Sequence, residues 1–191
     1  DLVELGVDLI VNLSASPYSL SKQKVREAML QHAARGYQQP LLYVNQVGAN
    51  DDLIFDGCSV GFNRAGEVVC SLRSFDTDLA VVEFDELKRD LQLGYVAPRQ
   101  ESEDEEIWHA LVLGVRDYTR KSGFSKVVIG LSGGVDSALV AAIAKEALGQ
   151  ENVLGVLMPS PYSSDHSLQD ALELSKNLGI QTHTLPIGEL M

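Results

Sequence analysis

The chain has 191 residues, which suggests one or two domains, and its hydrophobic content of 45% is ordinary for a globular protein with a real core. Its formal net charge of −12 argues against general nucleic-acid binding by a basic surface. The two cysteines and four scattered histidines show no metal-ligand spacing and are weak evidence for a disulfide framework. No apolar run is long enough to span a membrane, and the first residues do not resemble a signal peptide. We therefore expect a cytoplasmic protein with neither a membrane nor a nucleic acid as partner.

The first part of the chain is expected to be rich in strands, with one clear helix over residues 21–37. Helical spacing places Val25, Met29 and Ala33 on one face of that helix. The predicted strands cover residues 7–13, 41–47, 59–62, 67–72 and 79–84. Two of them flank Asn63-Arg64-Ala65-Gly66, which is typical of a hairpin turn. The pattern is lost after residue 86, where Gly94 and Pro98 indicate a domain boundary near residue 97.

The second part alternates strands and helices, which predicts an α/β fold with a parallel, doubly wound sheet. An amphipathic helix over residues 105–121 comes first, and its expected apolar side carries Ile107, Leu111, Gly114, Val115 and Tyr118. Strands are predicted over residues 126–131, 152–158 and 180–185, and helices over 138–148 and 167–178, each ending at a glycine. Ligands of such a sheet bind at the carboxyl ends of its strands, where residues 132–137 and 159–164 fall.

The loop Ser132–Ser137, in the run KVVIGLSGGVDS, is the stretch with the clearest chemistry. A strand, a glycine turn and a helix present free backbone N–H groups and a helix N-terminus to an anion. Ser132 and Ser137 add hydroxyl donors, and Asp136 suits a divalent cation held beside phosphate. The loop is not a Walker motif, because no lysine precedes Ser137. The alternative is a glycine turn that binds nothing.

Other candidates are weaker. Residues 159–164 (PSPYSS) suit a nucleotide if the two neighbouring strands pair, but they also suit an ordinary turn. Cys58 has no histidine close in sequence and is expected to pack rather than to act as a nucleophile, and Cys70 is weaker still. His166 and His183 are expected to have surface or capping roles, and Trp108 to have a packing role.

SGGVDS resembles the pyrophosphate loop of the N-type ATP pyrophosphatases, and the whole chain resembles the middle of a glutamine-dependent NAD+ synthetase. The motifs that carry the resemblance are GVDLIVNLSASPY, the helix with Lys22 and Arg26, YVNQVGANDDLIFDGCS, NRAGEVV, the stretch around Ser74-Phe75-Asp76, the run from EEIWHAL to SGGVDSALVAAIA, and GVLMPSPYSSDHSLQDALELSKNLGI. The resemblance implies that residues 1–97 are the C-terminal part of a nitrilase-like αββα glutaminase domain. Residues 98–191 would then be a linker and the first half of a Rossmann-like ATP-pyrophosphatase domain.

In that family, Mg-ATP adenylates the nicotinate carboxylate of deamido-NAD+, pyrophosphate leaves, and ammonia released from glutamine forms the amide. The resemblance assigns ATP binding to Gly130, Leu131, Ser132, Gly133, Gly134, Val135, Asp136 and Ser137. It makes Asp136 the Mg2+ ligand and Ser132 the residue that acts in the transition state. Ser16 and Lys22 match the family's glutamine contacts, for which an ordinary turn and a solvated helix start are the alternatives.

The resemblance also implies that the sequence is an internal piece of a longer protein. The family's Cys-Glu-Lys glutaminase triad would lie upstream of Asp1, and much of the deamido-NAD+ site beyond Met191. The chain alone is therefore expected to be inactive, and the intact protein to be a homo-oligomer. The alternatives are an ATP pyrophosphatase with another acceptor (GMP synthesis, asparagine synthesis or tRNA modification), a non-catalytic nucleotide-binding or scaffolding fragment, and a free-standing nitrilase-like amidase.

Overall fold

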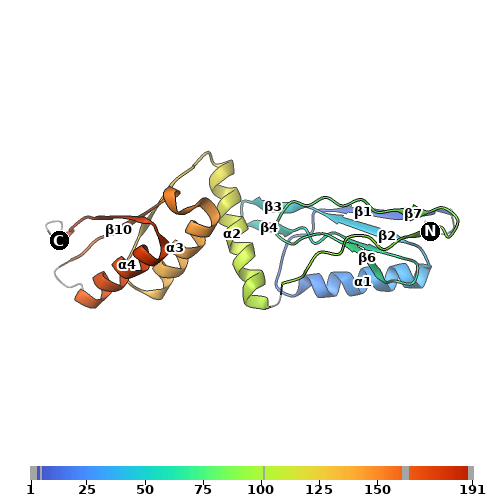
Figure 1. The fold of residues 1–191 in the computed structure, drawn as a ribbon, viewed down its shortest axis with the longest axis horizontal. Coiled ribbons are helices and arrows are strands. Elements are labelled where there is room, and N and C mark those ends of the chain that lie inside the picture. Colours follow the sequence, from blue (N-terminus) through green and yellow to red (C-terminus); the bar gives the residue numbers. More distant parts are fainter. Residues whose placement is uncertain (1–3, 5, 101, 161–163, 189–191) are drawn as a thin grey trace. The chain divides into compact units, whose positions relative to one another are not determined.

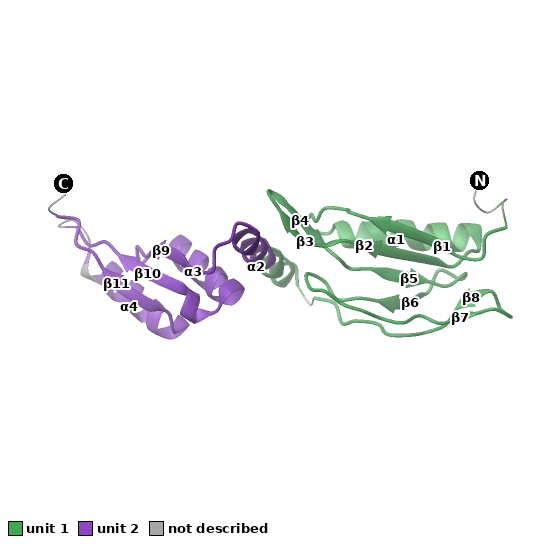
Figure 2. Ribbon diagram, turned by 90° about the horizontal axis from the view of Figure 1, so that it is seen from above, with its two compact units in different colours: residues 1–110 green, residues 111–191 purple. Residues whose placement is uncertain are grey.

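A computed structural model describes residues 4, 6–100, 102–160 and 164–188 (Figure 1). The chain divides into two compact units, residues 1–110 and 111–191 (Figure 2). One helix, α2 (Glu103–Lys121), belongs to both, because the division falls after Ala110. The domain boundary expected near residue 97, from the loss of pattern around Gly94 and Pro98, stays a prediction.

The first unit is built on a four-stranded sheet with one long helix. The strands of this sheet are β1 (Ile10–Ser14), β2 (Leu41–Asn45), β5 (Val60–Phe62) and β6 (Val68–Ser71), in the spatial order β1-β2-β5-β6. Helix α1 (Lys22–Tyr37) joins β1 to β2, and these two strands are parallel, as such a crossover requires. The other pairs in the sheet are antiparallel. Two small hairpins accompany it: β3 (Val47–Asn50) with β4 (Leu53–Asp56), and β7 (Phe84–Asp85) with β8 (Asp90–Leu91).

Helix α1 covers one face of this sheet and forms the core of the unit with it. Ala34 packs in a cluster with Tyr43 and Phe62, all at most 4% exposed. The apolar face expected from spacing is wrong, since Val25 and Met29 are 60% and 68% exposed. The stripe that faces inward carries Leu30 and Ala34, which pack in this cluster, and Arg26, which pairs with the buried Asp56.

The predicted hairpin over residues 63–66 is confirmed, and its turn packs on α1. Gly66 has φ +73° and donates its N–H to the carbonyl of Asn63 at 2.9 Å. The Gln31 amide donates to the Gly66 carbonyl at 2.8 Å, and Arg35 Nε donates to the Ala65 carbonyl at 3.1 Å. A Cβ on Gly66 would lie 2.9 Å from the Gln31 carbonyl oxygen, so this close approach of turn and helix requires glycine.

Two predicted strands of this unit differ from the structure. The strand over residues 79–84 is wrong except at Phe84: Leu79 and Val81 are 89% and 84% exposed, so the described residues do not bury their alternating side chains. The strand over 41–47 ends at Asn45, and Val47 begins the separate hairpin β3-β4. The tight turn of that hairpin uses Asp51 at φ +52°, a conformation that the aspartate side chain tolerates.

The second unit is a parallel sheet with helices between its strands. Its elements in chain order are β9 (Val127–Gly130), α3 (Val135–Leu148), a short 3-10 helix (Gln150–Asn152), β10 (Val153–Leu157), α4 (Asp165–Leu178) and β11 (Gln181–Thr184). The strand order is β11-β10-β9, and both pairs are parallel. The α/β architecture and the Rossmann-like half of the fold are therefore confirmed, with β10 in the centre.

Small side chains let α3 and α4 pack closely on one face of this sheet. Ala141 of α3 and Ala171 of α4 are at most 1% exposed and form a cluster with Val153 and Leu157 of β10. Gly149 and Gly179 cap the two helices as predicted, Gly179 in the left-handed conformation at φ +72°. Both helices and all three strands were thus correctly placed from their local patterns, within three residues at each end.

The predicted apolar side of α2 is wrong. Ile107, Leu111 and Tyr118 are 38%, 41% and 61% exposed, whereas Ala110 and Leu113 are 3% exposed. Apolar residues occur on more than one side of this helix, so periodicity alone did not select the buried stripe. Nowhere in the described ranges is a helix both long and apolar enough to cross a membrane.

Candidate functional site

The glycine loop lies at the carboxyl end of β9, where a ligand of a parallel sheet is expected. The buried residue Leu131 continues the strand by donating its N–H to the Val156 carbonyl of β10 at 2.9 Å. The chain then turns at Gly133, which has φ +82°. A Cβ on Gly133 would lie 2.2 Å from the carbonyl oxygen of Ser167 in α4, so only glycine permits this approach of loop and helix.

Two serine hydroxyls hold the loop in shape. Ser137 Oγ accepts the Ser132 N–H at 3.3 Å, lies 3.0 Å from Ser132 Oγ, and donates to the Gly134 carbonyl at 3.0 Å. Ser132 Oγ in turn accepts the Gly134 N–H at 3.2 Å. Helix α3 begins at Val135, three residues earlier than predicted, so Asp136 and Ser137 lie in its first turn. Gly134, the N-cap residue, has no side chain to occupy the N–H groups of that turn, which leaves this helix end suited to an anion.

A cavity of about 410 Å³ adjoins this loop. Its lining comes from the ends of β9 and β10 and from the start of α4: Leu131, Ser132, Leu157, Met158, Pro159, Ser164, Ser167 and Leu168. Ser164 caps α4 by accepting the Ser167 N–H at 3.2 Å. The expectation that the 159–164 loop lies beside the glycine loop is borne out by the pairing of β9 with β10, although residues 161–163 lie outside the described part of the chain.

Asp136 is exposed at the start of α3, and no hydrogen bond or ion pair joins its carboxylate to another described residue. In the described part of the chain, no three His, Cys, Asp or Glu side chains are grouped as a metal would need. A single carboxylate beside a phosphate-binding helix end fits Mg2+, which is commonly held by one or two carboxylates together with substrate phosphates and water.

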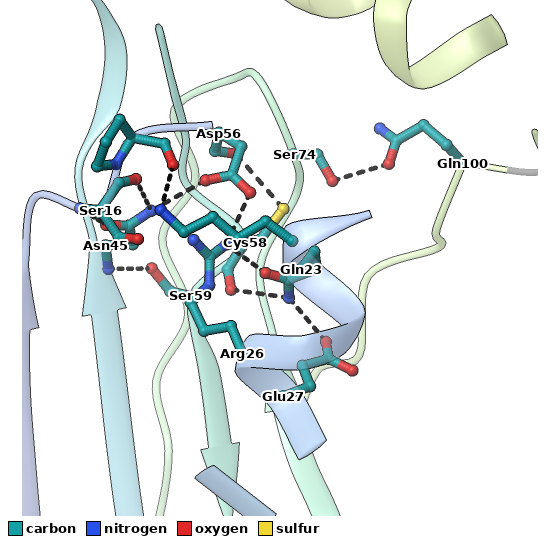
Figure 3. Close-up of polar contacts among 12 residues, drawn as sticks. Ser16, Gln23, Arg26, Glu27, Asn45, Asp56, Cys58, Ser59, Ser74 and Gln100 are labelled. Atoms are coloured by element: carbon teal, nitrogen blue, oxygen red, sulfur yellow. Dashed lines mark hydrogen bonds and ion pairs between the residues drawn. The ribbon is translucent and has the colours of Figure 1, made fainter. Parts of the chain in front are cut away.

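The glutamine contacts predicted in the first unit, Ser16 and Lys22, meet around one loop. The Lys22 ammonium at the start of α1 donates to the carbonyl of Pro17, the residue after Ser16, at 2.8 Å. The backbone of Ser16 pairs with the side chain of Asn45, the last residue of β2 (Figure 3). Lys22 is partly exposed, so its ammonium can carry a second interaction with a carboxylate.

Behind this loop lies a buried polar cluster. Arg26 and Asp56 form an ion pair at 2.7 Å, with side chains 9% and 4% exposed, and the guanidinium lies 5.3 Å from the centre of the Tyr43 ring. Burial acts to lower the pKa of Arg26, but the hydrogen bond and charge of Asp56 outweigh it and raise the pKa. Arg26 therefore stays charged and serves as a fixed partner of Asp56.

Cys58 lines a small cavity of about 90 Å³ next to this cluster, yet it is unsuited to nucleophilic chemistry. Its thiol donates to the Asp56 carbonyl at 3.5 Å. Burial, followed by the charge of Asp56, raises the pKa of this thiol to about 12, so it is a neutral thiol at physiological pH. Burial also raises the pKa of Cys70, and both cysteines are free. His166 and His183 are exposed, in keeping with the surface roles expected for them.

Sequence reasoning assigned no site role to Asn45, Asp56 or Arg26. These residues lie 11 to 30 positions apart along the chain, and no spacing rule joins them. The signal that was available is the residue type, because a buried charged residue needs a partner of opposite charge. Arg26 lies one helical turn after Lys22, and Asp56 lies at the end of a strand.

The comparisons with known proteins cover the whole chain and point to one family. Residues 107–191 match the family model for NAD synthase. The glutamine-dependent NAD(+) synthetase of Synechocystis sp. is 57% identical over 191 residues, which cover 100% of this chain and 34% of that protein. The corresponding protein of Thermotoga maritima is 42% identical over 217 residues, covering 97% of this chain and 38% of that protein.

Among solved structures, a glutamine-dependent NAD+ synthetase from Acinetobacter baumannii, in complex with adenosine diphosphate, superimposes with a TM-score of 0.93 at 40% identity. It covers 99% of this chain, which spans 36% of it. A glutamine-dependent NAD(+) synthetase from Cytophaga hutchinsonii shares the fold at a TM-score of 0.82 and 19% identity. The sequence and fold of this chain place it in the family of glutamine-dependent NAD(+) synthetases, as a segment of about a third of the length of the curated relatives it matches.

Proposed function

We propose that the protein containing this chain is an ATP-dependent ligase that converts deamido-NAD+ to NAD+ with nitrogen from glutamine. The observation that carries this proposal is the glycine loop at the end of β9, with an open helix N-terminus and a cavity of about 410 Å³ beside it. This arrangement suits the phosphates and the base of a nucleotide. The Acinetobacter baumannii relative, which matches this chain at a TM-score of 0.93, was solved with adenosine diphosphate.

The reaction has two steps. A carboxylate oxygen of deamido-NAD+ attacks the α-phosphorus of ATP, forming an acyl adenylate and breaking the bond to pyrophosphate. Ammonia then attacks the acyl carbon, the amide forms, and AMP leaves with the bonding electrons. Adenylation is needed because a carboxylate is a poor electrophile and its oxygen a poor leaving group.

In this proposal, residues 130–137 hold ATP. The backbone N–H groups of Gly133 and of the first turn of α3 donate to phosphate oxygens, whereas the Gly134 N–H is bonded to Ser132 Oγ within the loop. Asp136 holds Mg2+, which would neutralise charge on the departing pyrophosphate. The Ser132 hydroxyl lies at the mouth of the loop and donates to phosphate as charge develops, which makes it the residue best placed to act in the transition state.

The first unit supplies part of the glutamine site. Lys22 pairs with the glutamine α-carboxylate, and the loop at Ser16 contacts the same substrate. Residues 1–97 would be part of a nitrilase-like glutaminase domain whose Cys-Glu-Lys triad lies outside this chain. The chain alone is therefore inactive in this proposal. The intact protein works as a homo-oligomer in a reducing cytoplasm, which agrees with the two free cysteines.

The test is pyrophosphate release by the intact protein with Mg-ATP and deamido-NAD+, supplied with glutamine or with ammonium. We expect release and NAD+ formation with both nitrogen sources, and loss of both in Asp136→Ala. Glu146→Ala is the matched control, because Glu146 is an exposed acid near the other end of the same helix. Release only with another carboxylate or nucleotide acceptor would assign the protein to a different pyrophosphatase. Binding of Mg-ATP without any release would indicate a non-catalytic nucleotide-binding protein.

A further inference from the structure

Asn45 is a buried polar residue at the end of β2. The proposed reaction steps give it no role. It is 7% exposed, and its side chain contacts polar groups on two other segments of the first unit. One segment is the loop after β1, which carries Ser16, and the other is the end of β4, which carries Asp56. Figure 3 shows the Asn45 side chain between these two residues.

The Asn45 amide pairs with both backbone groups of Ser16. Its Oδ1 accepts the Ser16 N–H at 2.8 Å, and its Nδ2 donates to the Ser16 carbonyl at 3.3 Å. The register of β1 with β2 ends at Ser14 opposite Asn45, and the Gln46 N–H still donates to the Ser14 carbonyl at 2.9 Å. The side chain thus extends the pairing of the two strands beyond their last backbone bond and fixes the chain at Ser16.

Asp56 determines the orientation of the Asn45 side-chain amide. Asn45 Nδ2 donates to Asp56 Oδ1 at 3.0 Å, while Asp56 Oδ2 accepts from Arg26 at 2.7 Å. An ionised carboxylate only accepts hydrogen bonds, so the nitrogen of the amide must face Asp56 and its oxygen is left for the Ser16 N–H. The salt bridge to Arg26 holds the carboxylate in place, and breaking either link would leave a buried group unsatisfied.

The predicted glutamine contact Lys22 holds the same loop at the next residue, Pro17. Its ammonium donates to the Pro17 carbonyl at 2.8 Å, so two side chains, Asn45 and Lys22, fix the backbone of Ser16 and Pro17. Arg26 lies one turn after Lys22 on α1, and therefore the helix that carries Lys22 is also tied to Asp56. These contacts link the two predicted glutamine contacts through partly buried bonds at Ser16 and Lys22 and buried bonds at Asp56.

We propose that Asn45 is a positioning residue for glutamine: oriented by Asp56 and Arg26, it holds the Ser16 loop in the geometry that receives the amide donor together with Lys22. This inference rests on the proposed glutamine-dependent function. It assigns Asn45 no contact with the reacting atoms. Its effect reaches glutamine through Ser16, and nitrogen supplied as ammonium does not depend on it.

The test compares Asn45→Ala and Asn45→Asp with the wild type in the intact protein, with glutamine or ammonium as nitrogen source. We expect the KM for glutamine to rise by about tenfold in Asn45→Ala, the scale of effect of losing backbone hydrogen bonds that order a loop. NAD+ formation with saturating ammonium should stay within about twofold, since it reports on folding and on the ATP site.

The Asn45→Asp variant adds a second readout, the pH dependence of the KM for glutamine, which a residue with a merely structural role would not change. Its carboxylate can still accept the Ser16 N–H, but it repels Asp56 unless it is protonated, when it can donate as the amide did. The charged groups around it are Asp56, Arg26 and Lys22. We therefore expect its KM for glutamine to rise with pH more steeply than that of the wild type.

Asn63→Ala is the matched control, because the Asn63 side chain also accepts a backbone N–H at 2.8 Å, from Glu67, in a hairpin turn away from Ser16. Its KM for glutamine should be that of the wild type. An unchanged glutamine KM in both Asn45 variants, or equal losses with glutamine and ammonium, would overturn the positioning role. A wild-type protein that uses ammonium but no glutamine would instead overturn the glutamine half of the proposed function.

Discussion

Gly133 is the residue at which the nucleotide loop depends most directly on the absence of a side chain. It has φ +82°, and a Cβ there would lie 2.2 Å from the Ser167 carbonyl oxygen. Because that oxygen belongs to a helix backbone, the loop and not α4 must move in Gly133→Ala. We expect Mg-ATP affinity and pyrophosphate release in the intact protein to fall by at least about tenfold, as measured by calorimetry and a pyrophosphate assay.

Gly123→Ala separates conformational strain from this clash. Gly123 has φ +79°, but a Cβ there meets nothing within 4 Å. It should lose on the order of 1 kcal/mol of stability while pyrophosphate release stays normal. If both variants release pyrophosphate equally, the approach of the loop to α4 does not shape the nucleotide site.

Cys58 provides a prediction about pH at the same scale. Its raised pKa, about 12 in the folded protein, means that the unfolded chain releases the thiol proton first as the pH increases. The contribution of this group to stability is fully present below about pH 8.5 and is lost as the pH rises towards 12. Urea denaturation at pH 7 and pH 10 measures how far the free energy of unfolding falls between these two pH values. We expect this fall to be smaller in Cys58→Ala than in the wild type.

Thiol labelling checks the same prediction without a variant. At pH 7.5 in the native state, iodoacetamide should label Cys58 and Cys70 far more slowly than after denaturation, because both are buried, have raised pKa values and are therefore protonated. Rapid native labelling of Cys58 would show that its thiolate is accessible and would reopen a reactive role.

At the scale of elements, the buried pair Arg26–Asp56 joins α1 to the end of β4. Arg26→Leu leaves the Asp56 carboxylate buried without its counterion, which costs about 3–5 kcal/mol in comparable cases. Arg73→Leu is the control, because Arg73 has a half-exposed side chain and pairs near the surface with Asp76 and Asp78, and surface pairs are worth at most about 1 kcal/mol each. In urea denaturation, Arg26→Leu should lower the free energy of unfolding clearly more than Arg73→Leu does. Similar losses in the two variants would mean that Asp56 finds other partners.

At the scale of the whole molecule, the described chain carries apolar side chains that nothing in it covers. Val11, Leu13 and Val44 lie on neighbouring strands β1 and β2 and are 54%, 78% and 44% exposed. Contiguous exposed apolar surface favours association. We expect the 191-residue chain to self-associate with increasing concentration in light scattering, and Leu13→Lys to reduce this. Leu87→Lys, at an isolated position 99% exposed, should not.

The sequence by itself determined the second unit, because its signals are local. The alternation of apolar runs with helical patterns, the capping glycines Gly149 and Gly179, and the loop Ser132–Ser137 at a strand end were all legible within windows of a few residues. The pairing of β9 with β10 follows from a right-handed crossover of ordinary length. The assignment of ATP, Mg2+ and glutamine contacts to residues stays a prediction that the experiments above test.

Only the tertiary structure decided which faces of α1 and α2 are buried and what surrounds the Ser16 loop. Helical spacing favoured Val25 and Met29, yet α1 turns inward the face of Ala34 and Arg26, and Arg26 pairs there with a buried Asp56 some 30 residues away in sequence. Asn45 likewise meets Ser16 across 29 residues. A periodic pattern records only neighbours along the chain, whereas a buried charge must be satisfied by whichever groups the fold brings to it. The need to satisfy buried polar groups arises only once the chain is packed, and it explains the contacts of Arg26 with Asp56 and of Asn45 with Ser16.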